Sequence, residues 1–150
     1  IITRNQSLEL DLGIPLQEVL AVLGPDREAS FIFLAHAFRW SRIRTPGMDQ
    51  VLAEVDGIEM SSVNILAGQC HTHEGRFLPD PFPEYDQARQ DFDLIPVYNT
   101  DAHMDLAVGT IANQLPHTAL PADEAGLARL LKTSLPLEHQ NRKLLATILR

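Results

Sequence analysis

Hydrophobic residues near the start of the chain recur with helical spacing. Within residues 15–23, apolar side chains occur at i, i+3, i+4 and i+7, which is the pattern of an amphipathic helix. These positions are Leu16, Val19, Leu20 and Leu23. Pro15 suits the first turn of a helix, and the Gly-Pro pair at 24–25 ends one. The pattern therefore predicts an early helix over residues 15–23.

Two apolar segments follow that are rich in aromatic and branched residues. Residues 30–40 contain Ser-Phe-Ile-Phe-Leu and predict a buried strand, although their length also allows a helix. Residues 50–60 predict a second strand, or a pair of strands that turns at Asp56-Gly57. The segment between them contains Pro46-Gly47, which favours a turn.

Polar and apolar residues alternate with a period of two over residues 61–73. This alternation predicts a third strand, in which His71 and His73 extend the apolar face beyond the core. Residues 85–92 are polar and predict one or two helical turns. Residues 93–100 predict another strand, with Pro96 at an edge or a bulge.

The last third of the chain has mainly helical spacing. We expect a helix that is capped by Asp101 and ends before Pro116, and then two more helices over 121–135 and 136–150. The fold class predicted is α+β: a mixed sheet of four to five strands, an early helix, and a helical C-terminal layer over 101–150. Since 150 residues fit one domain and no flexible linker divides them, we expect a single globular domain over 1–150.

Charge limits the classes of partner. The chain carries a formal net charge of −8, which repels a polyanion unless basic residues gather on one face. The tight basic group Arg39, Arg42 and Arg44 lacks the density and interleaved aromatics of a nucleic-acid surface. We therefore expect a protein or peptide partner, basic in character, and no nucleic acid.

Composition also bears on the cellular environment. A single cysteine, Cys70, rules out an internal disulfide framework. The longest apolar run, residues 31–35, is much shorter than the roughly 20 residues that a membrane-spanning helix needs. With no targeting segment visible, cytoplasmic is the default expectation, and the pattern does not indicate an oligomeric state.

The His71-Thr72-His73 sequence is a candidate metal site. Residues two apart on a strand point the same way, so both imidazoles would face one ion. Catalytic zinc takes three protein ligands and leaves a fourth position to water. Asp80, Glu84 and Asp86 follow the pair, and any of them could supply the third ligand.

In its order of elements this arrangement resembles the JAMM metalloprotease family, whose MPN domain has an early Glu, then His-x-His at a strand end, then an acidic ligand opening a short helix. The resemblance covers about residues 15–100. It implies zinc held by His71, His73 and Asp86, with Glu28 as the catalytic base, and hence cleavage of a peptide or isopeptide bond. The sequence departs from that family at Pro83, where the family has serine, and at Glu74, where it has proline.

Two other metal families are set aside on fold. The His-x-His pair together with Thr100-Asp101-Ala102-His103 is similar to the metal motifs of PHP-type phosphoesterases. Those sites sit in a barrel of parallel strands, and such a barrel typically takes more than about 200 residues. A cupin pattern would need an all-β barrel, which the predicted helices contradict.

The remaining polar residues have simpler interpretations. We expect His103 to solvate the helix terminus that Asp101 caps, His36 to be a hydrogen-bonded core histidine, and Cys70 to pack as a small hydrophobic residue.

The competing functional class is an acidic binding module of the immunity or adaptor type. It would use the loop 74–86 for recognition, with Phe77, Phe82 and Tyr85 as anchors.

Overall fold

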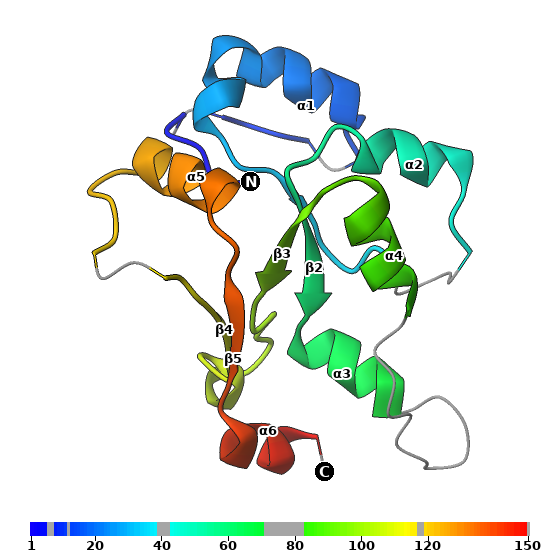
Figure 1. Ribbon diagram of the computed structural model, residues 1–150, viewed down its shortest axis with the longest axis vertical. Coiled ribbons are helices and arrows are strands. Elements are labelled where there is room, and N and C mark those ends of the chain that lie inside the picture. Colours follow the sequence, from blue (N-terminus) through cyan, green and yellow to red (C-terminus); the bar gives the residue numbers. More distant parts are fainter. Residues whose placement is uncertain (6–7, 12, 39–42, 71–82, 117–118, 150) are drawn as a thin grey trace.

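A computed structural model describes residues 1–5, 8–11, 13–38, 43–70, 83–116 and 119–149. The fold is mixed α+β, with two small sheets and helices around them (Figure 1). The helices are α1 (Leu16–Leu23), α2 (Pro46–Leu52), α3 (Val63–Cys70), α4 (Pro83–Asp91), α5 (Glu124–Thr133) and α6 (Arg142–Ile148), with 3-10 turns η1 (Gly24–Ala29) and η2 (Asp105–Ala107). The strands are β1 (Phe33–Leu34), β2 (Gly57–Ser61), β3 (Ile95–Tyr98), β4 (Ile111–Gln114) and β5 (Leu137–Gln140).

The first sheet is parallel and has the order β1-β2-β3. Each strand therefore pairs with the next along the chain, and all three carboxyl ends lie at the same edge. Figure 1 shows β2 and β3 pointing away from α1 and toward α3. Pro96 lies on β3, an edge strand of this sheet, which confirms the expected edge position.

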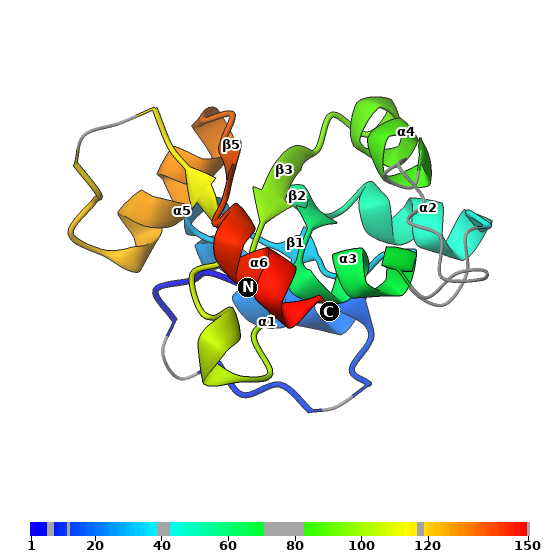
Figure 2. The same cartoon turned by 90° about the horizontal axis from the view of Figure 1, so that it is seen from below.

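Helices α2 and α4 lie on one side of the parallel sheet, and α5 with the β4–β5 ribbon lies on the other, as the turned view confirms (Figure 2). Alternate residues of the strands pack into two apolar cores. The core on the helical side is formed by α1, α2, α4 and the strands, with Leu23, Leu52 and Ile58 among its least exposed members. The core on the other side joins Phe31 and Val97 to α5.

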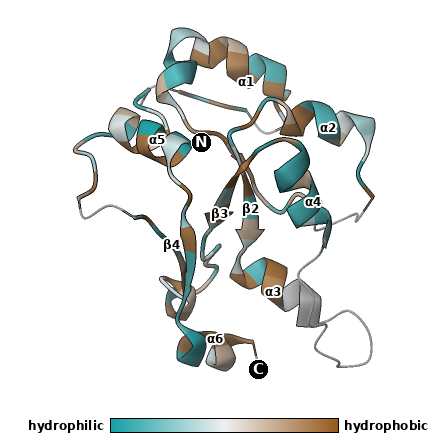
Figure 3. Ribbon diagram, viewed as in Figure 1, coloured by the Kyte–Doolittle hydropathy of each residue, from teal (hydrophilic) through white to brown (hydrophobic). Residues whose placement is uncertain are grey.

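Helix α4 has a mainly hydrophilic surface in Figure 3. Its two buried residues, Tyr85 and Ala88, attach it to the helical-side core. The Tyr85 ring packs edge-on against Phe38, with ring centroids 4.9 Å apart.

The second sheet is an antiparallel ribbon in which Ile111 pairs with Gln140 and Gln114 with Leu137. The Asn113 side chain joins it to the parallel sheet: its amide accepts a hydrogen bond from the Tyr98 backbone N–H at 2.9 Å and donates one to the Tyr98 carbonyl at 2.8 Å. The Asn113 side chain thus makes the pair of backbone hydrogen bonds to Tyr98 that a residue of an adjacent strand would make.

Several predicted elements are confirmed and several are wrong. Four predicted elements form as expected: the early helix (α1), the helical turns predicted over 85–92 (α4), the strand predicted over 93–100 (β3) and the helix predicted over 121–135 (α5). Residues 46–52 are helical, and only 57–61 of the second apolar segment form a strand. The predicted strand over 61–73 is wrong for residues 63–70, which form helix α3; residues 71–73 lie outside the described residues.

The C-terminal layer is only partly helical. The predicted helix beginning at Asp101 does not form, and residues 105–107 and 111–114 are instead a 3-10 turn and strand β4. In the predicted last helix, residues 137–140 pair with β4, so the helix is limited to Arg142–Ile148. Within the described ranges, no helix is long and apolar enough to cross a lipid bilayer.

Candidate functional site

The residues predicted from the His-x-His pattern are not assembled in the described part of the chain. His71 and His73 lie outside the described residues. Glu28 is exposed on η1, where its backbone carbonyl accepts a hydrogen bond from Lys132 Nζ at 3.4 Å. Asp86 is exposed in the first turn of α4.

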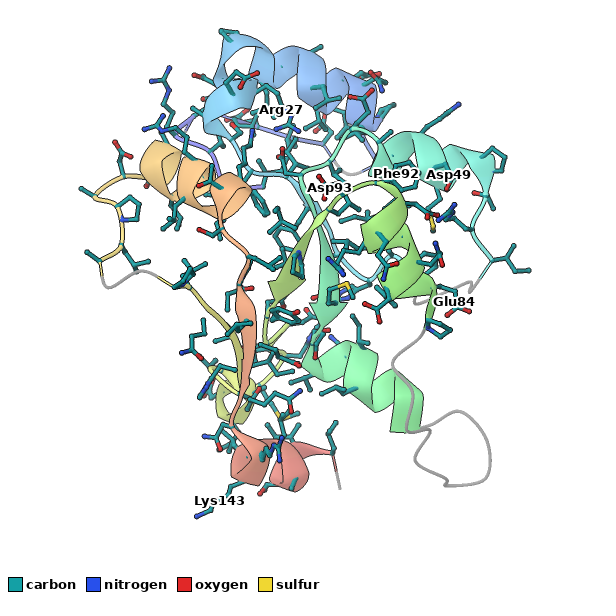
Figure 4. All side chains as sticks on the ribbon, in the orientation of Figure 1. Arg27, Asp49, Glu84, Phe92, Asp93 and Lys143 are labelled. Atoms are coloured by element: carbon teal, nitrogen blue, oxygen red, sulfur yellow. The ribbon has the colours of Figure 1, made fainter. Side chains whose placement is uncertain are left out.

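Glu28 and Asp86 do not lie together. Figure 4 labels Arg27, the neighbour of Glu28, and Glu84, two residues before Asp86. The two labelled residues are well separated. Arg27 belongs to η1, which lies beyond the amino end of the parallel sheet (Figure 1). The segment before His71 is helical rather than extended, so the predicted strand does not form over residues 63–70.

A different group of polar side chains gathers where the parallel strands end. We call it the polar cluster, and its members are His36, Glu59, Asn64, Asn99, Asp101 and His103. His36 follows β1, Glu59 lies on β2, and Asp101 follows β3. Carboxyl ends of neighbouring parallel strands are where open α/β sheets bind ligands.

His36 is the centre of the polar cluster because each of its ring nitrogens faces a carboxylate. Nδ1 lies 2.6 Å from Glu59 Oε2, and Nε2 lies 3.0 Å from Asp101 Oδ2. One imidazole thus joins two acidic groups from different strands.

Exposure increases across the polar cluster. The Glu59 side chain is completely buried, the side chains of His36 and Asp101 are 25% and 22% exposed, and that of His103 is 71% exposed. The polar cluster therefore extends from a buried carboxylate to an imidazole in solvent.

The buried Glu59 carboxylate accepts several hydrogen bonds. The His36 backbone N–H donates to Oε2 at 2.9 Å, and Asn99 Nδ2 donates to Oε1 at 2.5 Å. A buried carboxylate needs such donors because it has lost its hydration.

His36 Nδ1 is less well satisfied. It is buried and has no hydrogen bond of acceptable geometry, even though Glu59 Oε2 is only 2.6 Å away. Nδ1 therefore lies at contact distance from Glu59 Oε2 without being aligned with it for a hydrogen bond.

Asp101 is held from two sides. Asn64 Nδ2, at the start of α3, donates to Asp101 Oδ2 and lies 3.3 Å from His103 Nδ1. His103 Nδ1 is also 3.0 Å from the Asp101 carbonyl oxygen. The Asp-x-His segment and α3 thus form one connected group.

Backbone conformation directs two of these side chains. His36 has φ 50° and Asp101 has φ 45°, the left-handed region that residues other than glycine seldom adopt. Such a conformation costs about 1 kcal/mol or more unless surrounding bonds hold it. Here Glu59 bonds the His36 amide and Asn99 bonds the Asp101 amide.

Tyr85 supports the segment that follows His36. Its hydroxyl accepts a hydrogen bond from the Phe38 backbone N–H at 3.1 Å. Burial raises the pKa of Tyr85, and the negative charges of Glu59 and Glu84 raise it further, while the bond from Phe38 acts in the opposite direction. A recess of about 290 Å³ lies beside this segment and is lined by Phe38, Arg44, Pro83, Glu84 and Gln87.

The polar cluster has the donor types of a divalent-metal site: imidazole nitrogen and carboxylate oxygen. Among the described residues, no group of three or more histidine, cysteine or acidic side chains is arranged to hold a metal ion. The ring nitrogens of His36 instead lie at contact distance from the two carboxylates. The spacing of 3.0 Å between His36 Nε2 and Asp101 Oδ2 is nevertheless close to the roughly 3.3 Å that separates two ligands of a tetrahedral zinc ion.

Sequence reasoning assigned other roles to these residues. Asp101 was expected to cap a helix that does not form. His36 does contact a polar partner as expected, but it lies at the sheet edge, partly exposed, rather than in a core. Glu59 is a single acidic residue in an apolar run, inside strand β2, and no local pattern marks it. His36 and Asp101 follow the ends of β1 and β3, which is where open parallel sheets place ligand-binding residues.

Comparisons with models of protein families, with curated proteins and with solved structures found no match to this chain.

Proposed function

We propose that the polar cluster binds a divalent metal ion, zinc being the first candidate, and that the protein is a metal-dependent hydrolase of phosphate esters. The observation that carries the proposal is the meeting of His36, Glu59 and Asp101 at the carboxyl edge of the parallel sheet.

The charge balance favours a cation. Two carboxylates, one fully buried, face a single imidazole, so the group is negative whether the ring is neutral or protonated. Like charges held close together in a partly buried site are unfavourable without a counter-charge. A divalent ion would supply it and would also give His36 Nδ1 or Nε2 a partner.

The residues divide into separate roles. With Nε2 of His36 and the Asp101 carboxylate as ligands, Glu59 would lie against Nδ1, the other ring nitrogen, where carboxylates commonly orient metal-bound histidines. A bound divalent ion supplies Lewis-acid polarisation of a phosphoryl oxygen and a more acidic water. His103, exposed beside Asp101, is in position to give a proton to a leaving group or to add a ligand.

The phosphate-ester substrate class is proposed from the chemistry that a bound divalent ion would supply, since such an ion polarises a phosphoryl oxygen and makes a bound water more acidic. The partial likeness of Asp101-x-His103 to the PHP metal motifs gives no further support, because in the described residues the parallel strands form a three-stranded sheet and not the barrel of that family. The expected peptidase mechanism of Glu28, His71, His73 and Asp86 has no comparable support, and the two histidines stay predictions as further ligands.

The acidic binding module also stays a prediction, supported by the net charge of −8. Its recognition loop is corrected in one part: residues 83–86 begin helix α4, and Tyr85 is buried against Phe38 and is therefore not a surface anchor. Residues 74–82, with Phe77 and Phe82, lie outside the described residues.

The test is metal content and hydrolysis in matched variants. Wild-type protein incubated with Zn²⁺, Mn²⁺ or Co²⁺ and then desalted should retain metal and hydrolyse p-nitrophenyl phosphate. Asp101→Asn should lower metal affinity by about 100-fold or more, since even residues behind the ligands contribute 10- to 100-fold. Asp105→Asn, the same change at an exposed position in η2, should not.

A wild-type protein that retains no metal under these conditions, or an Asp101→Asn variant that retains it fully, would overturn the proposal. Cleavage of a peptide substrate but not of the phosphate ester would reject the substrate class and leave the metal site standing.

A further inference from the structure

We propose that Asn99 is a positioning residue of the polar cluster, and that its single amide sets both the buried carboxylate of Glu59 and the backbone turn of Asp101. The inference rests on the proposed function, because it assigns Asn99 to the metal site. Asn99 itself is not a ligand in this scheme and acts through its two neighbours.

The contacts of Asn99 show both connections. Nδ2 donates to Glu59 Oε1 at 2.5 Å, and Oδ1 accepts from the Asp101 backbone N–H at 2.8 Å. Its own backbone N–H donates to the Ser61 carbonyl at 3.1 Å. This last bond extends the β2–β3 pairing by one residue, so the amide starts from a fixed point on the sheet.

The two contacts require opposite chemistry. A carboxylate oxygen accepts only, so Glu59 Oε1 needs a donor, whereas the Asp101 N–H needs an acceptor. A primary amide offers both on one planar group. Aspartate at this position would offer two acceptors, leucine would offer neither, and a serine hydroxyl is shorter and could serve one partner well but not both.

Removing the Asn99 amide would leave two groups without their present restraint. Glu59 Oε2 is held by the His36 backbone N–H, but for Oε1 the described contacts give Asn99 as the partner. Rotation of this carboxylate would move Glu59 Oε2 away from its position beside Nδ1 of His36. The left-handed turn at Asp101, φ 45°, would lose the bond to its amide at the same time.

Asn113 provides a matched control on the neighbouring strand β4. Its amide also donates and accepts at once, with the Tyr98 backbone N–H at 2.9 Å and carbonyl at 2.8 Å. It has no contact with Glu59 or Asp101 among the described hydrogen bonds. Asn113→Leu therefore removes an equivalent pair of bonds from the fold without touching the polar cluster.

The experiment measures Co²⁺ binding by visible absorption and calorimetry in the wild type and in Asn99→Leu, Asn99→Ser and Asn113→Leu. Asn99→Leu should weaken binding by about tenfold or more, the usual effect of losing a group that orients a metal ligand, and should change the absorption spectrum of the bound ion. Asn99→Ser should lie between it and the wild type. Asn113→Leu should keep wild-type affinity and spectrum even though it lowers stability.

Hydrogen exchange gives a second measurement that needs no metal. The Asp101 amide should exchange faster in Asn99→Leu than in the wild type and at an unchanged rate in Asn113→Leu. Equal Co²⁺ affinity in Asn99→Leu and wild type, or an equal loss in Asn113→Leu, would overturn the role of Asn99 and leave the proposed function intact. A wild type that binds no Co²⁺ would overturn the proposed function and this role with it.

Discussion

Replacing Tyr85 by phenylalanine tests how the segment beyond His36 is held. The change removes one oxygen atom and leaves the ring, which is 2% exposed and packs edge-on against Phe38 at 82°. No cavity of side-chain size forms, and the aromatic contact stays. The hydroxyl is, however, the acceptor for the Phe38 backbone N–H at 3.1 Å, in a buried setting.

The expected loss follows from that amide. A buried donor left without an acceptor costs about 1–3 kcal/mol. For a chain of this length each kcal/mol lowers the melting temperature by about 2–4 °C, so the midpoint should fall by about 2–12 °C. Urea unfolding followed by far-UV circular dichroism gives the free energy, and an unchanged m-value shows that the same transition is measured.

Tyr98→Phe is the control, because Tyr98 is half-buried on β3 and its hydroxyl has no hydrogen bond in the part of the chain that the structure describes. It should change the free energy of unfolding by less than about 0.5 kcal/mol. Equal effects of the two substitutions, or no loss in Tyr85→Phe, would refute the reasoning.

The pH dependence gives a further check on the same side chain. Burial raises the pKa of Tyr85 in the folded protein, so above about pH 10 the unfolded chain releases its proton first and binds fewer protons than the folded state. Stability that is present below pH 10 is then lost as the pH rises toward the folded pKa. Tyr85→Phe should make this alkaline decline shallower.

Two other substitutions test the fold. Gly57→Ala would place a Cβ 2.7 Å from the Ile95 carbonyl oxygen and 2.9 Å from the Phe31 ring. Because a backbone carbonyl cannot move away, the free energy of unfolding in urea should fall by about 1–3 kcal/mol. An unchanged free energy would mean that β2 and β3 are less closely paired. Asp123→Ala removes the side chain that caps α5 by accepting from the Gly126 N–H; the expected loss is about 1 kcal/mol, and an Asp123→Asn variant that recovers none of it would contradict the capping role.

Local sequence patterns correctly predicted the elements whose stabilising contacts join residues close together in the sequence. The i, i+3, i+4, i+7 spacing predicted α1, and the helical spacing of residues 121–135 predicted α5. The predicted turn at Pro46-Gly47 is wrong: Thr45 accepts a hydrogen bond from the Met48 N–H and Pro46 occupies the first turn of α2. Proline and glycine there begin a helix because the cap residue precedes them.

Other elements depend on contacts that a local pattern does not contain. The apolar run 63–70 fits a strand or a helix, and it becomes α3 directly after β2 ends, with the Ser62 hydroxyl accepting from the Ile65 N–H. Strands β4 and β5 exist because they pair with each other across the intervening helix α5. Neither segment has a strong strand pattern by itself.

By itself the sequence determined the α+β class, the early helix, and a supply of imidazoles and carboxylates under a strongly negative charge. Only the tertiary structure decided which of them meet. His36 and Glu59 are 23 positions apart, and Glu59 and Asn99 are 40 apart, so no spacing rule links them. They come together because parallel strands align their carboxyl ends at one edge. The expected alignment of His71 and His73 depended on a strand over 61–73, of which residues 63–70 form helix α3 instead.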